Sequence, residues 1–254
     1  MSIKTAVLNG VATIEIARPE KKNALTVEMY QAMTNAINAA GESVTVRALL
    51  ITGQPGIFTS GNDLQDFLNR PRPNVESSPV FLFMQALMAC DKPVVAAVTG
   101  AAIGIGTTML LHCDFVYVSD EARLSMPFAS LGLVPEFGSS VLVPRLMGGR
   151  RAAEKLLLGD PFTAQTAGEC GIANAVLPAD EVLPHARRIA ERFNALPPGA
   201  VRESKRLMRE PDRAALIDAV KREAAVFTAQ LASAEAREAM RAVLEKRAPD
   251  FSKF

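Results

Sequence analysis

Short runs of apolar and β-branched residues alternate with turn-forming residues in the first part of the chain. Residues 3–8 and 11–17 are two such runs, and Asn9-Gly10 lies between them. Asn and Gly both tolerate a positive φ, which a tight two-residue hairpin requires. The pattern therefore predicts an antiparallel hairpin at the start of the chain.

A helix is predicted next, because apolar residues recur every three or four positions between Thr26 and Gly41. Thr26 is a suitable N-cap, and Gly41 is a suitable stop. The wholly apolar run 48–51 is typical of a strand that is buried on both faces. The same alternation then predicts helices at 80–89 and from residue 104 onward, and strands at 93–98, 114–119 and 123–125.

The strand pattern fades after about residue 139, and charged residues become more frequent. Strands that alternate with helices, followed by helices alone, indicate an α/β core with a helical extension. We place the core at 1–195 and a helical C-terminal region at 196–254. Prolines at 69–79 predict a surface loop. The helical patterns of the second part cover 150–158, 164–170, 180–194, 199–208, 212–232 and 234–247.

Composition narrows the class of protein and its compartment. The 254 residues include 28 basic and 27 acidic side chains, and a net charge of +1 favours neither nucleic acid nor an anionic membrane as the main partner. No apolar stretch approaches the ~20 residues that span a bilayer. Three widely spaced cysteines and two histidines form neither a disulfide framework nor a metal motif. We expect a cytoplasmic protein without a metal site.

Two glycine-containing turns follow buried strands. The first, 59–64, reads Thr-Ser-Gly-Asn-Asp-Leu, and the second, 100–106, leads into a helix. Glycines let the backbone approach a ligand with its N–H groups exposed, and a helix start favours negative charge. The residues alone leave a ligand site and simple packing turns as alternatives. Gly104-x-Gly106 lacks the third glycine of a dinucleotide site, which disfavours a nicotinamide-dependent dehydrogenase.

Glu136 lies in a mostly apolar segment, between Pro135 and Phe137. A carboxylate in such surroundings either faces water on a turn or lies in an apolar cleft. Burial in a cleft would raise its pKa, which suits a general base near neutral pH. The local sequence leaves both alternatives open. His112, in an apolar helix end, is expected to pack in the core.

Several ordered motifs resemble the crotonase superfamily, the enoyl-CoA hydratase/isomerase group, over essentially the whole chain. The resemblance implies a ClpP-like α/β spiral of ββα units with a helical C-terminal trimerisation region. It also implies a CoA thioester substrate, no cofactor apart from the coenzyme A of that substrate, and a homotrimer or a hexamer. The motifs that carry it are 18–25, 58–64, 92–100, Gly104-Ile105-Gly106 with Cys113-Asp114, 131–133 and 171–174.

Site residues follow from the resemblance by position. The backbone N–H groups of Asn62 and Ile105 correspond to the oxyanion hole that binds the thioester oxygen. An enolate needs such preorganised donors where its charge develops. Lys21 and Lys22 fall in a loop that contacts CoA in relatives. The full set implied for substrate binding is Lys21, Lys22, Ser60, Gly61, Asn62, Asp63, Leu64 and Ile105.

Departures from the superfamily pattern bear on the reaction. Hydratases of this group use two glutamates, and Thr108 and Phe128 stand at their positions. Neither side chain is a general base at neutral pH. Glu136 instead matches the single catalytic glutamate of peroxisomal-type Δ3,Δ2-enoyl-CoA isomerases, which share Ser-Gly-Asn-Asp-Leu at the first turn. We therefore expect an isomerase of fatty-acid oxidation that converts 3-enoyl-CoA to 2-trans-enoyl-CoA.

Two alternatives remain open. One is a 2-enoyl-CoA hydratase or another enolate-using CoA enzyme, and the other is an inactive CoA-binding trimer. A trimer or a hexamer is expected because the C-terminal helices carry an apolar stripe that the core of one subunit is not expected to cover fully. The stripe consists of Leu216, Val220, Phe227 and Leu231. The final Ser252-Lys253-Phe254 differs from the peroxisomal Ser-Lys-Leu signal, in keeping with a cytoplasmic location.

Overall fold

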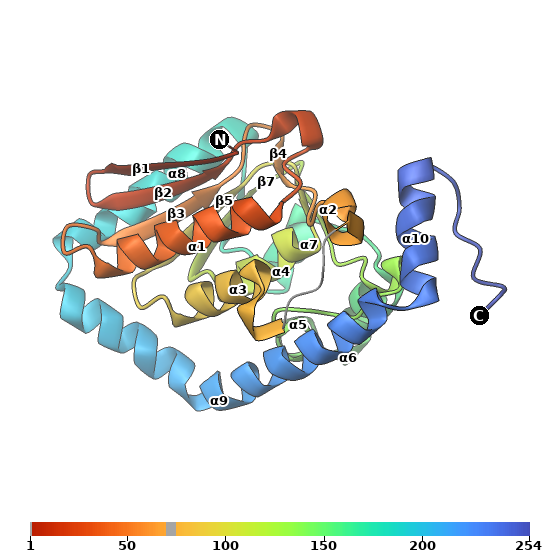
Figure 1. Ribbon diagram of the computed structural model, residues 1–254. Coiled ribbons are helices and arrows are strands. Elements are labelled where there is room, and N and C mark those ends of the chain that lie inside the picture. Colours follow the sequence, from red (N-terminus) through yellow and green to blue (C-terminus); the bar gives the residue numbers. More distant parts are fainter. Residues whose placement is uncertain (1, 70–74) are drawn as a thin grey trace.

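Two sheets form the centre of the computed structural model, which describes residues 2–69 and 75–254 (Figure 1). The larger sheet has the strand order β1-β2-β3-β5-β7-β10. Its first pair is the predicted hairpin, which is antiparallel with Ile3 opposite Ile16, and the other pairs are parallel. The strands are β1 (Ile3–Leu8), β2 (Val11–Ile16), β3 (Ala48–Thr52), β5 (Val94–Val98), β7 (Phe115–Ser119) and β10 (Ala175–Leu177).

The smaller sheet has the order β4-β6-β8-β9, in which β9 is antiparallel to β8. One strand of each sheet and then a helix follow one another three times along the chain, which is the ββα unit that the resemblance implies. Sequence analysis predicted a turn at 100–106, but part of it pairs as β6. Strands of two or three residues carry little periodic pattern, so β4, β6, β9 and β10 were missed, although β8 was predicted. The strands are β4 (Ile57–Thr59), β6 (Ala101–Ile103), β8 (Arg123–Ser125) and β9 (Phe162–Thr163).

Helices cover both faces of the larger sheet (Figure 1). On one face lie α1 (Val27–Glu42) and α3 (Pro79–Ala89), and on the other lies α8 (Ala179–Glu191). Successive residues of a strand face opposite sides. In β3, Leu49 belongs to the cluster under α1 and Leu50 to the cluster under α8. Burial on both faces explains why β3 and β5 are apolar throughout.

The first long helix begins and ends almost where the sequence predicts. The Thr26 hydroxyl accepts a hydrogen bond from Met29 N at 3.4 Å, so Thr26 is the N-cap. The helix continues to Glu42, and Ser43 is its C-cap. The prediction that Gly41 stops the helix is therefore wrong. Gly41 does not take the left-handed conformation that makes glycine useful at a helix end.

The helix predicted from residue 104 onward is a single turn, α4 (Ile105–Thr108), continued by the 3₁₀ helix η3 (Met109–His112). The predicted loop at 69–79 is replaced at its edges by helical residues, and residues 70–74 lie outside the described part of the chain. The other helices are α2 (Leu64–Asn69), α5 (Ser139–Met147), α6 (Gly149–Ala153) and α7 (Ala164–Glu169), with the short helices η1 (Pro19–Lys21), η2 (Val75–Ser77), η4 (Ala129–Leu131), η5 (Glu154–Leu158) and η6 (Arg192–Ala195).

A single long helix, α9 (Pro198–Leu231), replaces the two predicted at 199–208 and 212–232. Pro211 lies inside it. Proline removes one backbone hydrogen bond of a helix and bends it, without always ending it. Figure 1 shows α9 changing direction near its middle. The final helix is α10 (Ala234–Glu245).

The apolar stripe of α9 packs partly against the core of its own subunit. Val220 is buried, Leu216 lies against Gly138, and Phe227 and Leu231 pack on the main core. Leu216, Phe227 and Leu231 remain half-buried, so the core of one subunit covers the stripe only in part. Other apolar side chains of α9 are exposed, among them Met208 at 83%.

Ion pairs also join α9 to the core. Lys205 Nζ lies 2.6 Å from one carboxylate oxygen of Asp114, and Arg209 lies 2.7 Å from the other. Asp114 also accepts a hydrogen bond from Val94 N, at the start of β5. Asp114 thus connects the central sheet to the C-terminal region.

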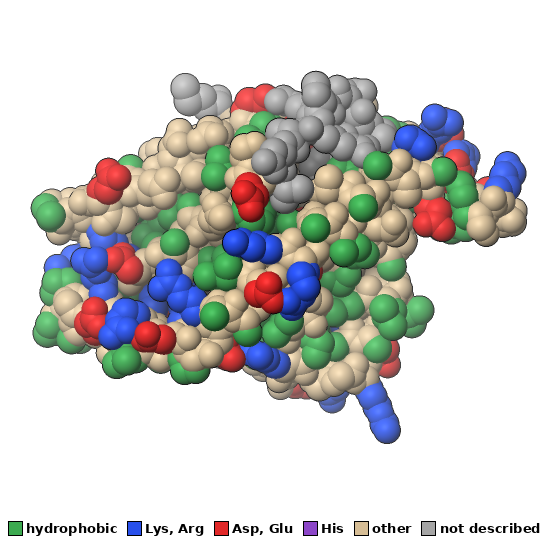
Figure 2. Space-filling view, turned by 60° about the horizontal axis from the view of Figure 1, so that its bottom comes forward, with side chains coloured by type: hydrophobic (Ala, Val, Ile, Leu, Met, Phe, Trp, Pro, Cys, Tyr) green, Lys and Arg blue, Asp and Glu red, His purple; other side chains and the backbone are tan. Residues whose placement is uncertain are grey.

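The surface over α9 mixes charges of both signs. Figure 2 shows Lys and Arg side chains next to Asp and Glu side chains rather than in separate patches. Along the helix, Arg206 pairs with Glu203 and Glu210, and Arg222 pairs with Asp218. Within the described residues, no helix is both long and apolar enough to cross a membrane.

Candidate active site

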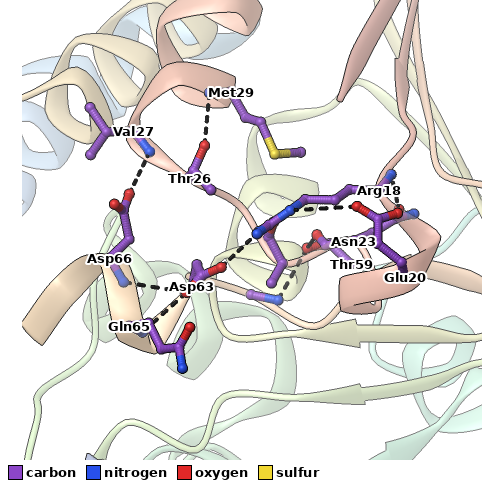
Figure 3. Close-up of polar contacts among 12 residues, drawn as sticks. Arg18, Glu20, Asn23, Thr26, Val27, Met29, Thr59, Asp63, Gln65 and Asp66 are labelled. Carbon is purple, nitrogen blue, oxygen red and sulfur yellow. Dashed lines mark hydrogen bonds and ion pairs between the residues drawn. The ribbon is translucent and has the colours of Figure 1, made fainter. Parts of the chain in front are cut away.

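The first glycine turn is held by a dense polar network (Figure 3). Arg18 lies 2.7 Å from Asp63 Oδ2 and also donates to Ala24 O. The other oxygen of Asp63 accepts from the backbone N–H groups of Gln65 and Asp66, at the start of α2. Burial alone would raise the pKa of Asp63, but the hydrogen bonds from Arg18 and from these amides hold the pKa below its usual value. Asp63 is therefore an ionised structural brace.

Hydrogen bonds of Asn23 also stabilise the first glycine turn. Its side chain is fully buried and bonds Arg18 N, Ile57 O and Phe58 O. Its carbonyl accepts from the Thr59 hydroxyl, which in turn accepts from Gly61 N. The left-handed φ of 56° at Asn23 is one that asparagine adopts more readily than most residues. The motif at 18–25 therefore shapes the turn at 59–64.

The lysines of this motif lie at the surface. Lys21 and Lys22 are exposed, and the Lys22 carbonyl accepts from Ser60 N at 3.1 Å. Ser60 and Leu64 are half-buried, and Gly61 is buried. The two lysines therefore stand at the rim of the first turn, where their ammonium groups reach solvent.

The N–H of Asn62 points away from the segment that pairs with it. Leu25 N donates to Gly61 O, and Asp63 N donates to Leu25 O. This is the parallel bridge of Leu25 with Asn62, in which the residues flanking Asn62 make the bonds and its own N–H faces the opposite side. Among the described hydrogen bonds, none uses Asn62 N. This amide is available to a ligand.

The second turn packs directly against the first. A Cβ on Gly61 would lie 2.9 Å from Ile103 O, and a Cβ on Gly106 would lie 2.5 Å from the Thr59 methyl group. Both positions therefore require glycine. Gly104, with φ 57°, turns the chain into α4, and its carbonyl accepts from Thr107 N and Thr108 N.

Ile105 N lies in the first turn of α4, where helical N–H groups have no partner within the helix. No described hydrogen bond uses it. The structure thus brings the amides of Asn62 and Ile105 to two turns in contact. Ile105 itself is fully buried, so its side chain serves the core while its N–H remains unpaired.

Tyr30 links the first turn to Glu136. It is 1% exposed, and its hydroxyl donates to Asn62 Oδ1. Burial raises the pKa of Tyr30 well above its usual value, and the negative charge of Glu136 raises it further. The Tyr30 ring also packs on Phe83, which contacts Phe137. Glu136 therefore lies within electrostatic reach of the side chain that holds Asn62.

Glu136 is buried, with 4% of its surface exposed. Its Oε1 has no hydrogen-bond partner among the described residues. Burial raises the pKa of Glu136 to about 8, and the nearby charge of Glu223 contributes to the rise. The alternative of a water-facing turn is therefore wrong, since such a turn would leave this carboxylate exposed. An unpartnered, proton-binding carboxylate is what a general base requires.

The backbone next to Glu136 is unusual. Phe137, with φ 61°, and Gly138, with φ 74°, are successive residues in the left-handed region. A left-handed φ is strained for a bulky side chain such as phenylalanine. The His112 ring stacks on the Phe137 ring at 3.9 Å and shares a hydrogen bond of 2.7 Å between Nε2 and Phe137 O. This turn is thus fixed by packing on both of its sides.

His112 is a core residue, as predicted. Its burial lowers the pKa to about 4, so the ring is neutral at physiological pH. Because a carbonyl oxygen can only accept, Nε2 carries the proton of this bond. The ring nitrogen that faces Phe137 therefore helps to hold the Glu136 turn.

The two hydratase positions hold no carboxylate. Thr108 Oγ1 is buried and has no hydrogen-bond partner among the described residues. Phe128 is 4% exposed, and its ring lies against Gly104. At the two positions where hydratases of this group carry glutamates, the second turn thus has the hydroxyl of Thr108 and the ring of Phe128.

Sequence reasoning missed two residues of this site, Tyr30 and Glu223. Glu223 belongs to α9 and accepts hydrogen bonds from Gly138 N and from the backbone and side chain of Ser140. Tyr30 was not singled out within the periodic helix of 26–41. Each contact joins residues that are far apart along the chain, so no local pattern indicates it.

The structure also has a hollow of about 250 Å³ away from this site, between the end of α1 and the start of α9. Two basic side chains that line this hollow, Lys92 and Arg47, already donate hydrogen bonds to backbone carbonyls. Lys92 Nζ donates to the carbonyls of Ala40 and Ser43, and Arg47 donates to Leu196 O. The hollow therefore belongs to the scaffold that ends α1.

Comparison with known proteins agrees with this architecture. The family model described as "Enoyl-CoA hydratase/isomerase" matches residues 7–253. A solved structure of OdaA from Pseudomonas aeruginosa has 49% sequence identity and a TM-score of 0.93, covering 96% of this chain and 98% of that one. The spiral α/β fold with its helical C-terminal region is therefore confirmed.

Curated relatives carry two different names. The 2,3-dehydroadipyl-CoA hydratase of Escherichia coli K12 is 30% identical over 241 residues, or 95% of this chain and 94% of the relative. The human enoyl-CoA delta isomerase 2 is 36% identical over 211 residues, or 81% of this chain and 53% of the relative. Together with the match over nearly the whole length, these likenesses show that the chain is an enzyme of the enoyl-CoA hydratase/isomerase family, the crotonase superfamily.

Proposed function

We propose that the protein is a Δ3,Δ2-enoyl-CoA isomerase, which moves the double bond of a 3-enoyl-CoA to the 2-trans position. The observation that carries this proposal is the single buried carboxylate of Glu136, which has an unpartnered oxygen and a pKa raised to about 8. Moving a double bond requires one group that takes a proton and returns it elsewhere. Glu136 has the proton affinity for both steps.

In the first step, the ionised Glu136 removes a proton from C2 of the substrate. The C2–H electron pair becomes part of a dienolate, whose negative charge develops on the thioester oxygen. The amides of Asn62 and Ile105 stabilise that oxygen. They are fixed before the reaction by the parallel bridge of Asn62 and by Gly104. Preorganised backbone donors are effective because they need no reorganisation as the charge forms.

In the second step, the protonated Glu136 returns the proton to C4, and the double bond forms between C2 and C3. Glu136 is again ionised, so the reaction is redox-neutral and consumes no second reactant. The reaction thus needs no cofactor besides the coenzyme A of the substrate. The raised pKa suits this cycle, because a strongly acidic carboxyl group would be a weak acceptor for a carbon-bound proton.

Substrate binding is assigned to the first turn and its rim. Exposed Lys21 and Lys22 offer positive charge to the phosphates of CoA, while Ser60, Gly61 and Leu64 border the path from the rim to Asn62. The ion pair of Asp63 with Arg18 stabilises the conformation of this turn. We assign Asp63 to substrate binding through this support, since both of its oxygens are engaged.

A hydratase is the second candidate, because Thr108 has a buried, unpartnered hydroxyl at one of the two hydratase positions. Such a hydroxyl can bind a water molecule, and the Escherichia coli relative is named a hydratase. A hydroxyl at neutral pH is nevertheless a poor base for activating that water. We therefore rank hydration below isomerisation.

The deciding experiment compares 3-enoyl-CoA and 2-enoyl-CoA as substrates of the purified protein under the same conditions. We expect isomerisation of the 3-enoyl-CoA to be faster by kcat/KM. Faster hydration of the 2-enoyl-CoA would establish the second candidate. Binding of acyl-CoA without either reaction would establish an inactive CoA-binding protein.

We also propose that the chain forms a homotrimer or a hexamer, as the family resemblance implies. Exposed apolar side chains on α9 and α10, such as Met208 and Val243, are available for such contacts. Light scattering at micromolar concentration tests this assembly. A stable monomer would contradict it.

A further inference from the structure

The carboxylate of Glu223 caps the helix that follows Glu136. Its Oε2 accepts from Gly138 N at 2.6 Å, and its Oε1 accepts from Ser140 N at 2.9 Å and from the Ser140 hydroxyl. These groups belong to the first residues of α5 and to its N-cap, Gly138, which has no side chain to cap the helix itself. The cap is therefore supplied by α9, from 85 residues further along the chain.

The capped residues continue directly from the strained backbone at Glu136. Phe137 and Gly138 are both left-handed, and a Cβ on Gly138 would lie 2.4 Å from Leu216 Cδ1 of α9. The Glu136 carbonyl accepts from Ser139, through both its N–H and its hydroxyl. The backbone from 136 to 140 is thus held against α9. Its conformation persists because the surrounding contacts determine it.

The surroundings of Glu136 and Glu223 give the two carboxyl groups different affinities for a proton. Burial raises the pKa of Glu223, but three donated hydrogen bonds and the charge of Arg222 favour its ionised form. Glu136 Oε1 has no such donor among the described residues. The other titratable groups that face the Glu136 turn are Tyr30 from α1 and His112 from η3. The hydrogen bonds therefore favour the ionised form of Glu223, while burial without a donor at Oε1 favours the protonated form of Glu136.

We propose that Glu223 is a positioning residue for the catalytic base: its cap on α5 fixes the 136–140 turn that aims Glu136, and its negative charge favours the protonated form of the Glu136 carboxyl group. This inference rests on the proposed isomerase function and deepens it. Glu223 touches neither substrate nor the reacting atoms. Its effect passes through Gly138 and Ser140.

The test replaces Glu223 with glutamine, which keeps the size of the side chain but removes its charge and turns one acceptor oxygen into a donor. We expect kcat for 3-enoyl-CoA to fall about 10- to 100-fold, because small displacements of a reacting group have effects of this order. KM should change less than about twofold, since the substrate contacts remain. The acid limb of the pH profile should move to lower pH by about one unit.

A second readout does not depend on catalysis. Infrared difference spectroscopy follows protonation of the Glu136 carboxyl group, with Glu136→Gln used to assign its band. The midpoint should move to lower pH in Glu223→Gln. If the wild type fails to isomerise 3-enoyl-CoA, the proposed function is lost, but the infrared midpoint still decides the role of Glu223.

The matched control is Glu210→Gln, which makes the same change of charge on α9 at an exposed residue paired with Arg206. Its kcat and infrared midpoint should equal those of the wild type. A purely structural role for Glu223 would lower stability without moving the midpoint, so an unshifted midpoint and unchanged kcat in folded Glu223→Gln overturn the proposal. If that variant does not fold, Ser140→Ala, which removes one donor to Glu223, takes its place. An unshifted midpoint there overturns the proposal in the same way.

Discussion

The turn of Asp63 and the turn of Glu136 each place a carboxylate at the candidate site, and they treat it in opposite ways. Asp63 accepts from Arg18 and from two backbone amides, which hold its pKa below the usual value. Glu136 has an oxygen without any described partner, and burial raises its pKa to about 8. Both turns are well fixed, one by polar bonds and the other by aromatic packing and the cap from Glu223.

This difference assigns a structural role to Asp63 and a chemical role to Glu136. Satisfied hydrogen bonds make Asp63 a stable anion with little capacity to exchange protons. Leaving Glu136 unsatisfied destabilises the folded protein at this point, and such local costs concentrate at functional sites. A substitution at Glu136 should therefore lower reactivity most, whereas one at Asp63 should act mainly by lowering stability.

The largest effect is expected for Glu136→Gln, which keeps the shape and removes the base. We expect kcat for 3-enoyl-CoA to fall by at least ~10²-fold, since general-base catalysis supplies ~10²–10⁴. Acyl-CoA affinity, measured by calorimetry, should stay nearly unchanged. For the wild type, kcat/KM should rise with pH through a midpoint near 8, the pKa of Glu136. Isomerisation by Glu136→Gln at the wild-type rate would rule out this base.

The same substitution should improve stability in a pH-dependent way. The pKa of Glu136 is raised from 4.5 when unfolded to about 8 when folded, so between these values the folded state binds the extra proton. Wild-type stability therefore falls as pH rises through this window, and Glu136→Gln removes the fall. At about 1.4 kcal/mol per pKa unit, the difference reaches at most about 5 kcal/mol above pH 8. Urea unfolding at pH 5 and pH 9 measures it, and a pH-independent difference would contradict the assignment.

Two substitutions of Asn62 distinguish the role of its backbone N–H from the role of its side chain. Asn62→Pro removes the N–H assigned to the oxyanion and should lower kcat/KM by about 10²–10³-fold. Asn62→Ala keeps this N–H but leaves the buried Tyr30 hydroxyl without its acceptor, which should cost about 1–3 kcal/mol of stability. Much of the activity of the folded protein should survive.

The double variant Tyr30→Phe with Asn62→Ala is the control, because it removes both partners of that hydrogen bond. It should recover part of the lost stability. Equal and severe losses of activity in Asn62→Ala and Asn62→Pro would show that the side chain, and not the N–H, carries the function.

The smallest effect on chemistry is expected at Asp63. Asp63→Asn breaks the largely buried pair with Arg18 and should lower the free energy of unfolding by about 2 kcal/mol. The difference from the wild type should shrink in acid, because stability from a carboxylate of lowered pKa is lost as pH falls through that pKa. Asp212→Asn, in an exposed pair with Arg145, is the matched control and should change stability by less than about 1 kcal/mol. Equal losses of unfolding free energy in both variants would show that the Arg18–Asp63 pair stabilises the protein no more than an exposed ion pair does.

The hairpin, the first helix and the buried strands were predictable, because each depends on residues close together in the sequence. The short strand β6 was missed, since its residues lie in a glycine-containing segment that indicated a turn and its identity depends on pairing with β4 and β8. The continuity of α9 through Pro211 was missed for a related reason. Proline disfavours a helix locally, while packing of Val220 and its neighbours on the core favours one.

The candidate site divides in the same way. The segment around Glu136 indicated an apolar setting, and the glycines of both turns indicated close backbone contact. Tyr30 and Glu223 could not be found, because each acts across a long separation in sequence through one hydrogen-bonded partner. Such partners become visible when the fold brings Asn62 and Gly138 to them.

The order of synthesis gives the cap on α5 a further consequence. A ribosome adds about 5–20 residues per second, and N-terminal parts begin to fold first. Ser140 therefore leaves the ribosome well before Glu223, which lies 83 residues later, and at these rates the delay is roughly 4–17 s. During that time both sheets can assemble while the 136–140 segment lacks its carboxylate. The two turns that carry the Asn62 and Ile105 amides can therefore form before the segment that carries Glu136 receives its cap.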